Sequence, residues 1–260
     1  MCHINKDFPL ICRSKETIEL SVANILGISR GMLRHLLSID YMQIYEGKPF
    51  HDTDFSEYLY GEFLLKNNLI PNTISRIHWF HGTRCFPETA FMKKGILPLG
   101  MVMHQLFAKI DDIAEKNSIM ATDTDDSWCT HYFSLFVLKT ENPAHWGPYA
   151  MLMKEALLSV EVYDFHNYLD IPEIVEDYIY SKYPLSSDIL LEIYRKETRA
   201  CIVEFWTLPM DRQEDTLETA LYYLYSSYHK SDYSMFCNTC YDGNGKPIPA
   251  DQIISVEYID

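Results

Sequence analysis

The chain has little glycine and little positive charge. Its 260 residues include 10 glycines, and no glycine-rich loop of the kind that cradles nucleotide phosphates is present. Lysine and arginine number 22 against 37 aspartate and glutamate residues, so the formal net charge is −15. The phosphate backbone of nucleic acid repels an acidic protein unless the protein's basic residues cluster. The composition therefore argues against nucleic-acid binding through overall charge.

Long apolar runs and a regular cysteine framework are also missing. No stretch of about 18 apolar residues occurs, so we expect no membrane span and no membrane partner. Lys6, Asp7 and Arg13 interrupt the start of the chain, which does not have the pattern of a signal peptide. The seven cysteines are an odd number without regular spacing. Reduced thiols in a cytosol fit this pattern best, so we expect a cytoplasmic protein.

Aromatic and apolar residues, by contrast, are abundant. The chain has 19 Tyr, 13 Phe and 4 Trp, and 47% of its residues are hydrophobic, which is enough to bury a sizeable core. Charge is distributed unevenly. Residues 1–50 hold six basic and five acidic side chains, so the rest of the chain carries nearly all the negative charge. We expect a basic partner to bind the later part, and any contact with nucleic acid to start near the N-terminus.

Two helices are predicted near the N-terminus. Ile18, Val22 and Ile25 recur at three- and four-residue spacing, as on the buried face of a helix. Gly27 interrupts this pattern, and a second helix is predicted to begin at Ser29. These features predict a helical hairpin.

Residues 23–30 resemble the helix-turn-helix of DNA-binding proteins, in which a glycine makes the turn. The second helix then presents Arg30, Arg34 and His35. The alternative is a helical hairpin that only packs on the main domain, since two arginines make a small basic face. We divide the chain into an N-terminal helical region, residues 1–70, and a second domain, residues 71–260.

The rest of the chain mixes helices with strands. There is no strict alternation of strand and helix, so we predict an α+β fold. A polar loop is expected at residues 122–128 and a hairpin turn at residues 242–245, which read Asp-Gly-Asn-Gly. The predicted helices cover residues 55–65, 87–94, 101–116, 172–183, 187–196 and 213–228, and the predicted strands cover residues 77–80, 132–138, 149–153, 160–165, 201–206 and 253–259.

Residues 80–84, Phe-His-Gly-Thr-Arg, carry groups suited to a nucleotide. His81 follows a predicted strand, which would hold its imidazole in a fixed position. Gly82 has no side chain, so a ligand can approach its backbone and pair a carboxamide with its N–H and C=O. Thr83 and Arg84 add a hydroxyl group and a fixed positive charge, which suit ribose and phosphate.

Residues 80–84, together with residues 91–97, resemble the first strand and following helix of the ADP-ribosyltransferase superfamily. That superfamily includes the poly(ADP-ribose) polymerases and the diphtheria-type toxins. The resemblance implies a split, highly curved β-sheet with NAD bound in a cleft as substrate and without a metal. It implies that His81 bonds the nicotinamide ribose and that the backbone of Gly82 grips the nicotinamide carboxamide.

The resemblance also implies a tyrosine that stacks on nicotinamide from a later strand. Tyr132 and Tyr149 both lie on predicted strands. We prefer Tyr149, because Gly147 and Pro148 stand immediately before its strand and suit the edge of a cleft.

A catalytic glutamate is the third feature that the resemblance implies. Residues 247–256 are similar to the last strand of such domains, and the family's glutamate would lie on the strand before it. This chain has Asn238 there, which could orient a ribose hydroxyl but supplies no negative charge. Glu257 and Glu204 are two other carboxylates on predicted strands, and we take Glu257 as the first candidate for the catalytic residue.

Cys237 and Cys240 have a spacing that is found in metal and redox sites. A zinc site needs a second pair of ligands, and Cys201 and His229 do not form one at a suitable spacing. A thioredoxin-like site needs this pair at the start of a helix, whereas the context here is a hairpin.

The resemblance therefore predicts an enzyme that takes ADP-ribose from NAD and passes it to a macromolecule, either nucleic acid or protein. Stand-alone members of such families are often toxins of toxin–antitoxin or phage-defence systems, so a neutralising antitoxin protein is an expected partner. The alternative, from a different class, is a non-catalytic nucleotide-binding or interaction protein with a helix-turn-helix-like N-terminal module.

Overall fold

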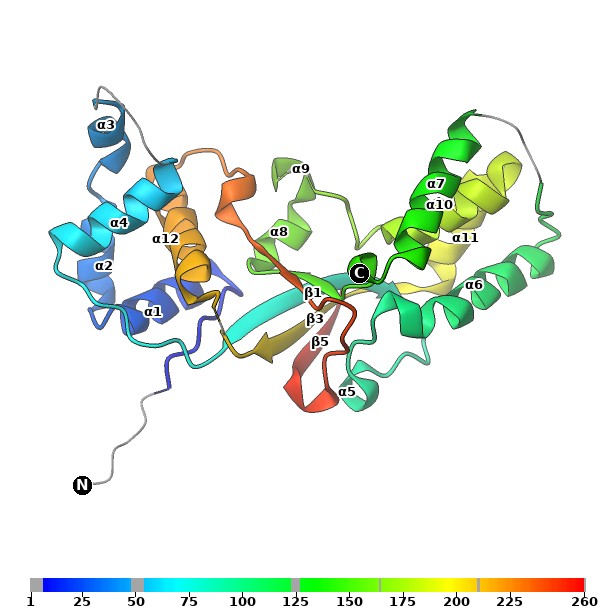
Figure 1. Ribbon diagram of the computed structural model, residues 1–260, viewed down its shortest axis with the longest axis horizontal. Helices are drawn as coiled ribbons and strands as arrows, with labels where there is room; N and C mark the ends of the chain where they lie inside the picture. Colours follow the sequence, from blue (N-terminus) through cyan, green and yellow to red (C-terminus); the bar gives the residue numbers. More distant parts are fainter. Residues whose placement is uncertain (1–6, 48–53, 123–126, 164, 210, 260) are drawn as a thin grey trace. The chain divides into compact units, whose positions relative to one another are not determined.

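The chain folds into two compact units in the computed structural model, which describes residues 7–47, 54–122, 127–163, 165–209 and 211–259 (Figure 1). Unit 1 consists of Met1–Trp79, Met151–Phe165 and Trp206–Cys240, and unit 2 consists of Phe80–Ala150, His166–Phe205 and Tyr241–Asp260. Unit 1 therefore takes in more of the chain than the predicted N-terminal region, residues 1–70.

Unit 1 is built from helices that pack around α12. Leu217, Leu221 and Leu224 of α12 are buried, as the helical spacing predicts, whereas Tyr228 is 42% exposed. Helix α12 contacts α1, α2, α4 and η3. The helices of this unit are α1 (Lys15–Ile25), α2 (Arg30–Leu37), α3 (Tyr41–Glu46), α4 (Phe55–Lys66), α8 (Lys154–Leu158), α9 (Val160–Tyr163), α12 (Gln213–His229) and the short 3-10 helix η3 (Met235–Cys237).

The N-terminal hairpin forms as predicted because each helix has its own start signal. The Ser14 hydroxyl accepts from the Thr17 backbone N–H, and the Thr17 hydroxyl oxygen accepts from the Ser14 backbone N–H. The Ser29 hydroxyl accepts from the Met32 backbone N–H at the start of α2. Gly27 lies between the helices with φ of +67°, a conformation that glycine adopts readily.

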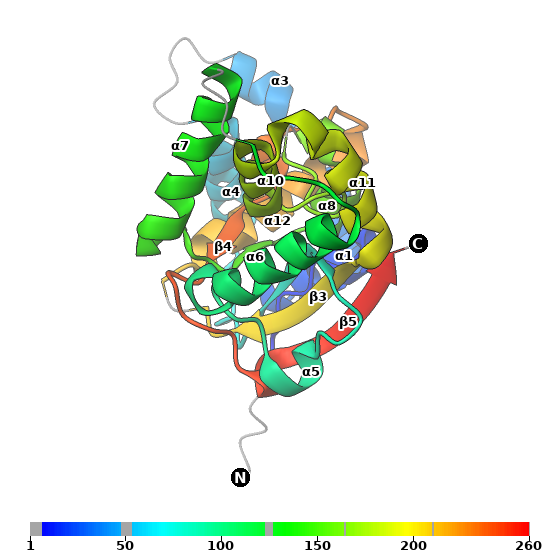
Figure 2. The same cartoon turned by 90° about the vertical axis from the view of Figure 1, so that its right-hand side faces the viewer.

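Unit 2 contains a cluster of four longer helices, α6, α7, α10 and α11, which Figure 2 shows grouped together. Their shared core is apolar and includes Ile110, Val175, Ile179 and Leu190. The helices of this unit are α5 (Phe91–Lys94), α6 (Leu99–Lys116), α7 (Ser127–Glu141), α10 (Glu173–Lys182) and α11 (Ser187–Glu197), with the 3-10 helices η1 (Pro143–His145), η2 (Pro184–Ser186) and η4 (Ala250–Gln252).

A five-stranded sheet completes the fold, which confirms the α+β class. The strand order is β4-β2-β1-β3-β5, and β3 pairs with β5 in antiparallel register, with Cys201 opposite Tyr258. Figure 2 shows α5 beside β5. The strands are β1 (Ile77–Cys85), β2 (Tyr149–Met151), β3 (Arg199–Thr207), β4 (Cys240–Asp242) and β5 (Ile253–Ile259).

Two predicted strands are helices in the structure. Residues 132–138 lie within α7, and residues 160–163 form α9. The first error has a clear cause, because residues 132, 136 and 139 recur at helical spacing and meet α10. Tyr132 stacks on Tyr180, the Phe136 ring contacts Tyr178, and Lys139 pairs with Asp177. A short apolar run does not distinguish a strand from a buried helix by periodicity alone.

The predicted hairpin turn forms a turn without joining two paired strands. The Asp242 side chain accepts from the Asn244 backbone N–H, and Gly245 has φ of +72°. However, β4 before the turn and β5 after it occupy opposite ends of the strand order. The sequence after the turn instead makes an isolated antiparallel bridge between Ile248 and Ile96. The predicted loop at residues 122–128 lies mostly outside the described residues.

Candidate functional site

Strand β1 carries the predicted nucleotide motif. The strand runs on from the buried Ile77 through His81, Gly82 and Thr83 and ends at Cys85, so the motif lies within the strand. It extends this far because β1 has a neighbouring strand on each side, β2 and β3. Gly82 is buried, whereas His81 and Thr83 are half-buried.

The His81 imidazole is tied to the neighbouring strand. Its Nδ1 lies 2.7 Å from the backbone carbonyl oxygen of Tyr149 on β2. A carbonyl oxygen only accepts hydrogen bonds, so Nδ1 carries the proton and donates. Burial lowers the pKa of His81, and the bond to Tyr149 offsets only part of this effect. The ring is therefore neutral at pH 7, with Nε2 as an acceptor.

Tyr149 presents a partly exposed aromatic ring next to this histidine. The residue is 41% exposed, and its hydroxyl donates to the Ala144 carbonyl oxygen at 3.1 Å. Burial of part of the ring raises the pKa of Tyr149, as do the charges of Asp242 and Glu173. The hydroxyl therefore stays protonated, and the tethered ring offers an exposed surface for stacking.

Two glycines allow the segments around this site to pack closely. Gly95 follows α5 with φ of +74°, and a Cβ there would overlap the carbonyl group of Ile248. A Cβ on Gly100 would overlap the Trp146 ring. The Leu99 backbone N–H also donates to the Trp146 carbonyl oxygen at 2.9 Å. These contacts hold the residues before Tyr149 against the start of α6.

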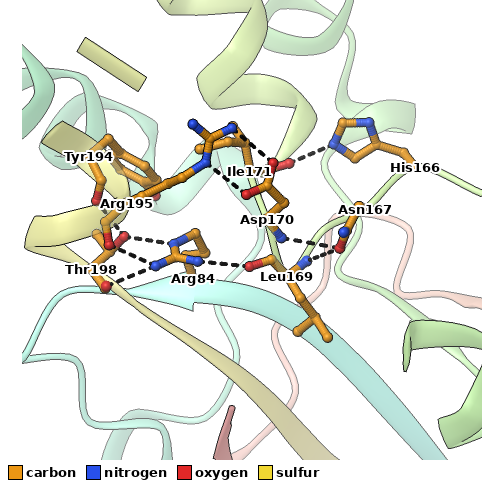
Figure 3. Close-up of polar contacts among 9 residues, drawn as sticks. All are labelled: Arg84, His166, Asn167, Leu169, Asp170, Ile171, Tyr194, Arg195 and Thr198. Carbon is orange, nitrogen blue, oxygen red and sulfur yellow. Dashed lines mark hydrogen bonds and ion pairs between the residues drawn. The ribbon is translucent and has the colours of Figure 1, made fainter. Parts of the chain in front are cut away.

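Arg84 points its guanidinium group at backbone carbonyls, as Figure 3 shows. Nη1 donates to Leu169 at 2.9 Å, and Nη2 donates to the carbonyl oxygens of Arg195 at 2.7 Å and Thr198 at 3.0 Å. Nε donates to the Thr198 hydroxyl at 3.0 Å. Four of the five N–H groups of the arginine are therefore used.

This network explains the position of Arg84 by structural needs. Arg195 and Thr198 lie at the C-terminal end of α11, where the last carbonyls lack helical partners and the helix dipole is negative. A guanidinium there satisfies those oxygens and is favoured by the dipole. The sequence predicted that Arg84 binds phosphate. In the structure its side chain instead caps the C-terminal end of α11.

Thr83 also has a partner within the chain. Its hydroxyl donates to the Arg84 carbonyl oxygen at 3.4 Å, which is a long hydrogen bond. The side chain is half-buried. Of residues 81–84, His81 and Thr83 keep side-chain groups that a ligand could use, whereas Gly82 is buried within the strand.

The two candidate carboxylates occupy different places in the sheet. Glu204 is 3% exposed on β3, the strand beside β1, and accepts from the Ser255 hydroxyl at 3.4 Å. Glu257 is exposed on β5, opposite Ile202. Strand β3 separates β5 from β1, and two strand spacings amount to about 10 Å. The strand order therefore places Glu204 one strand away from β1 and Glu257 two strands away.

Asn238 and Tyr132 have partners that differ from those expected. Asn238 is 8% exposed in unit 1, where its Oδ1 accepts from the Met153 backbone N–H at 2.9 Å and its Nδ2 donates to Met151 Sδ. The predicted ribose contact would compete with both bonds. Tyr132 lies on helix α7 and stacks on Tyr180, with ring centroids 4.6 Å apart. Tyr149 is therefore the better candidate for nicotinamide stacking.

The basic face predicted for the N-terminal hairpin is largely paired. Arg30 and Arg34 both bind the carboxylate of Glu19, with N–O distances of 3.0 Å and 2.7 Å. Burial opposes ionisation of Glu19, but hydrogen bonds from the two arginines outweigh it and lower the pKa of the carboxyl. The two arginine side chains nevertheless remain 42% and 52% exposed.

The structure also bears on the cysteine pair of the predicted hairpin. The Cys237 thiol donates to the Ser226 hydroxyl, and the Cys240 thiol donates to Met151 Sδ. Within the described ranges, no group of three or more His, Cys, Asp or Glu side chains is placed to hold a metal ion. In the same part of the chain, no helix is both long enough and apolar enough to cross a membrane.

A shallow groove lies along one face of α7. None of the residues predicted for the nucleotide site lines this groove. The groove comes near that site only through Asn142, which caps η1, since Ala144 of η1 accepts from the Tyr149 hydroxyl. The groove is lined by Phe133, Ser134, Val137, Leu138, Glu141 and Asn142.

Sequence reasoning missed one contact between reactive groups. Cys85 and Cys201 are 116 residues apart, and their thiols meet because β1 and β3 are neighbours. Their spacing in the sequence carries no signal, and only knowledge of the strand order could have paired them.

Comparisons of this chain with protein-family models, with curated proteins and with solved structures found no match.

Proposed function

We propose that the chain is an NAD-dependent ADP-ribosyltransferase whose nicotinamide site lies at β1 and β2. One observation carries the proposal: His81 and Tyr149 are 68 residues apart in sequence, and the His81 imidazole donates to the Tyr149 carbonyl oxygen. The sequence resemblance also assigns these two residues to one site, His81 as the ribose contact and Tyr149 as the ring that stacks on nicotinamide. We further propose that the sheet around them corresponds to the split sheet of that superfamily.

The protonation of His81 supports a role in holding ribose. Because Nδ1 donates to Tyr149, Nε2 of the neutral ring remains to accept a hydrogen bond from a ribose hydroxyl. Gly82 follows without a side chain, and we assign the contact with the nicotinamide carboxamide to its backbone. The exposed ring of Tyr149 supplies a flat apolar surface for nicotinamide.

The reaction needs stabilisation of positive charge. When the bond between nicotinamide and ribose breaks, its electron pair leaves with nicotinamide and positive charge develops on the sugar. A carboxylate beside the ribose stabilises that charge before a nucleophile of the target bonds the same carbon. We assign this role to Glu204, which lies on the strand next to β1, and keep Glu257 as the alternative.

The proposed acceptor is a macromolecule, either protein or nucleic acid, and the proposed biological role is that of a toxin or anti-phage effector. The net charge of −15 supports a basic protein as the neutralising antitoxin, because complementary charge steers association.

The test measures release of nicotinamide from NAD by the purified chain, with and without cell extract as a source of target. We expect release by the wild type, and loss by at least 100-fold in His81→Ala and Glu204→Gln, since each removes a transition-state contact. Glu257→Gln is the matched control, because this exposed carboxylate lies on the far side of β3. Circular dichroism establishes that each variant is folded.

The outcomes separate the candidate functions. Release that survives His81→Ala in a folded protein contradicts the proposed site. If NAD raises the unfolding temperature of the wild type but no nicotinamide is released, the chain is instead a non-catalytic nucleotide-binding protein. Loss in Glu257→Gln but not in Glu204→Gln reverses the assignment of the carboxylate.

A further inference from the structure

Two buried thiols meet at the end of the strand that carries His81. The Sγ atoms of Cys85 and Cys201 lie 3.7 Å apart. Cys85 is the last residue of β1, Cys201 lies near the start of β3, and the two residues are 5% and 0% exposed. The pair is therefore held in contact by the sheet and shielded from large reagents.

The backbone geometry suits a disulfide between these strands. Figure 1 shows β1 and β3 as neighbours that point in opposite directions. Residues that face each other across antiparallel strands have Cα atoms about 4.5–5.5 Å apart. Disulfides span Cα separations of about 4.4–6.8 Å. Bond formation therefore needs side-chain rotation and a small approach of the sulfurs, and the strands keep their places.

The two thiols differ in acidity in the way that disulfide formation requires. The hydrogen bond from Cys201 lowers the pKa of Cys85 against the effect of burial, and the charges of Arg199 and Arg84 lower it further. The same hydrogen bond and burial raise the pKa of Cys201. This difference favours Cys85 as the attacking thiolate and Cys201 as the thiol that resolves the sulfenic acid.

We propose that Cys85 and Cys201 form a redox-sensitive dithiol that hydrogen peroxide converts into a disulfide joining β1 to β3. In the first step the Cys85 sulfur attacks one peroxide oxygen, the O–O bond breaks and a sulfenic acid forms with release of hydroxide, which takes up a proton to become water. In the second step the Cys201 sulfur attacks the sulfenic sulfur, an S–S bond forms, and the hydroxyl leaves with the Cys201 proton as water. Each sulfur is oxidised by one electron, and the peroxide is reduced to two waters.

The disulfide would link the end of the His81 strand to its neighbour. It closes a long loop, because 116 residues separate the two cysteines in sequence. Such a crosslink restricts the unfolded chain and raises the stability of the folded form. This inference is independent of the proposed transferase activity, since it concerns the sulfurs and the sheet alone.

The Cys237–Cys240 pair provides an internal comparison. It has the spacing of many redox pairs, yet its thiols bond Ser226 and Met151. Cys240 is also exposed, whereas Cys85 and Cys201 are buried. If solvent exposure decides which thiol is oxidised, Cys240 should react first. If contact between the two thiols decides, the disulfide should form between Cys85 and Cys201.

The experiment treats the reduced full chain with hydrogen peroxide, blocks remaining thiols by alkylation and maps peptides by mass spectrometry without reduction. We expect one major crosslinked peptide pair, Cys85 with Cys201, lighter by two hydrogen atoms and released by dithiothreitol. Cys85→Ser and Cys201→Ser should each lack it, whereas Cys240→Ser should retain it. The oxidised wild type should also unfold at a higher temperature than the reduced form.

Other results would overturn the proposal. These are a crosslink that maps to Cys237 and Cys240, or oxidation of Cys240 in the folded chain without any link between Cys85 and Cys201. If the disulfide forms but leaves the unfolding temperature unchanged or lower, the inferred stabilisation by a link between β1 and β3 is refuted. Peptide mapping of the wild type alone shows whether Cys85 and Cys201 are linked, so this result does not depend on whether a serine variant folds.

Discussion

Replacing Arg84 by alanine tests whether this side chain anchors unit 2 or binds phosphate. The structure engages four of its N–H groups with the Leu169 carbonyl, two oxygens of Thr198 and the Arg195 carbonyl. Three of these acceptors lie at the C-terminal end of α11. We expect Arg84→Ala to destabilise the fold and to leave intrinsic NAD affinity nearly unchanged.

The expected loss is about 3 kcal/mol. A single hydrogen bond to a charged group contributes roughly 1.5–3 kcal/mol, and removing the dipole contact at the helix end costs roughly another 0.3–1 kcal/mol. The four bonds do not add fully, because Arg84 is half-buried and water can reach some of the freed carbonyls. Arg84→Lys should recover a minor part, since an ammonium group lacks the planar fork.

Urea unfolding followed by circular dichroism measures this loss, and calorimetry measures NAD affinity of the folded variants. Arg195→Ala is the matched control, because Arg195 pairs with Asp170 at the surface and should cost no more than about 1 kcal/mol. An Arg84→Ala protein as stable as the wild type, but with NAD affinity lowered 10-fold or more, would refute the structural reading. That result would instead support the prediction that Arg84 binds a phosphate of NAD.

Three further predictions follow from side chains on the two units. Burial depresses the pKa of His81, so the unfolded chain binds a proton at this histidine before the folded chain does as pH falls. The free energy of unfolding should therefore decline below about pH 6.5, and urea titrations of His81→Gln should lack that part of the decline. Gly100→Ala should lower the free energy of unfolding by about 1–3 kcal/mol, because its Cβ overlaps the indole ring packed against it. Glu19→Gln should cost about 1–2 kcal/mol in the same assay, because it weakens the bonds to both arginines of α2.

Each of these has a control within the chain. Gly61→Ala adds a Cβ with no heavy atom within 4 Å and should stabilise α4 by roughly 0.5–1 kcal/mol, so equal losses at the two glycines would contradict the overlap with the indole ring. Glu16→Gln changes an exposed carboxylate on the same helix as Glu19 and should have a smaller effect. For the pH dependence, a slope in His81→Gln identical to that of the wild type would show that other groups cause it.

Local signals in the sequence predicted most of the helices. The predicted helices at residues 172–183, 187–196 and 213–228 match α10, α11 and α12 to within one residue at each end. Apolar residues at three- and four-residue spacing indicated α1, and Ser29 and Gly27 marked the limits of the N-terminal hairpin. The predicted strand at residues 77–80 is the first part of β1, which continues through residues 81–85. These signals work because caps, turns and amphipathic faces depend on residues a few positions apart.

Local signals were insufficient where the partner lies far along the chain. Residues 132–138 have strand-like composition, yet they form a helix because α10 buries one side of it. The charge of Arg84 suggested phosphate, and the end of α11 took its donors instead.

The sequence by itself therefore determined the elements with strong local periodicity, the α+β class and the chemical character of His81 and its neighbours. Tertiary structure decided the strand order, which brings His81 to Tyr149, places Glu204 beside β1 and joins the Cys85 and Cys201 thiols. The physical reason is that hydrogen bonds between strands and side-chain contacts pair groups by distance in space. Spacing along the chain constrains such pairs only when they are close in sequence.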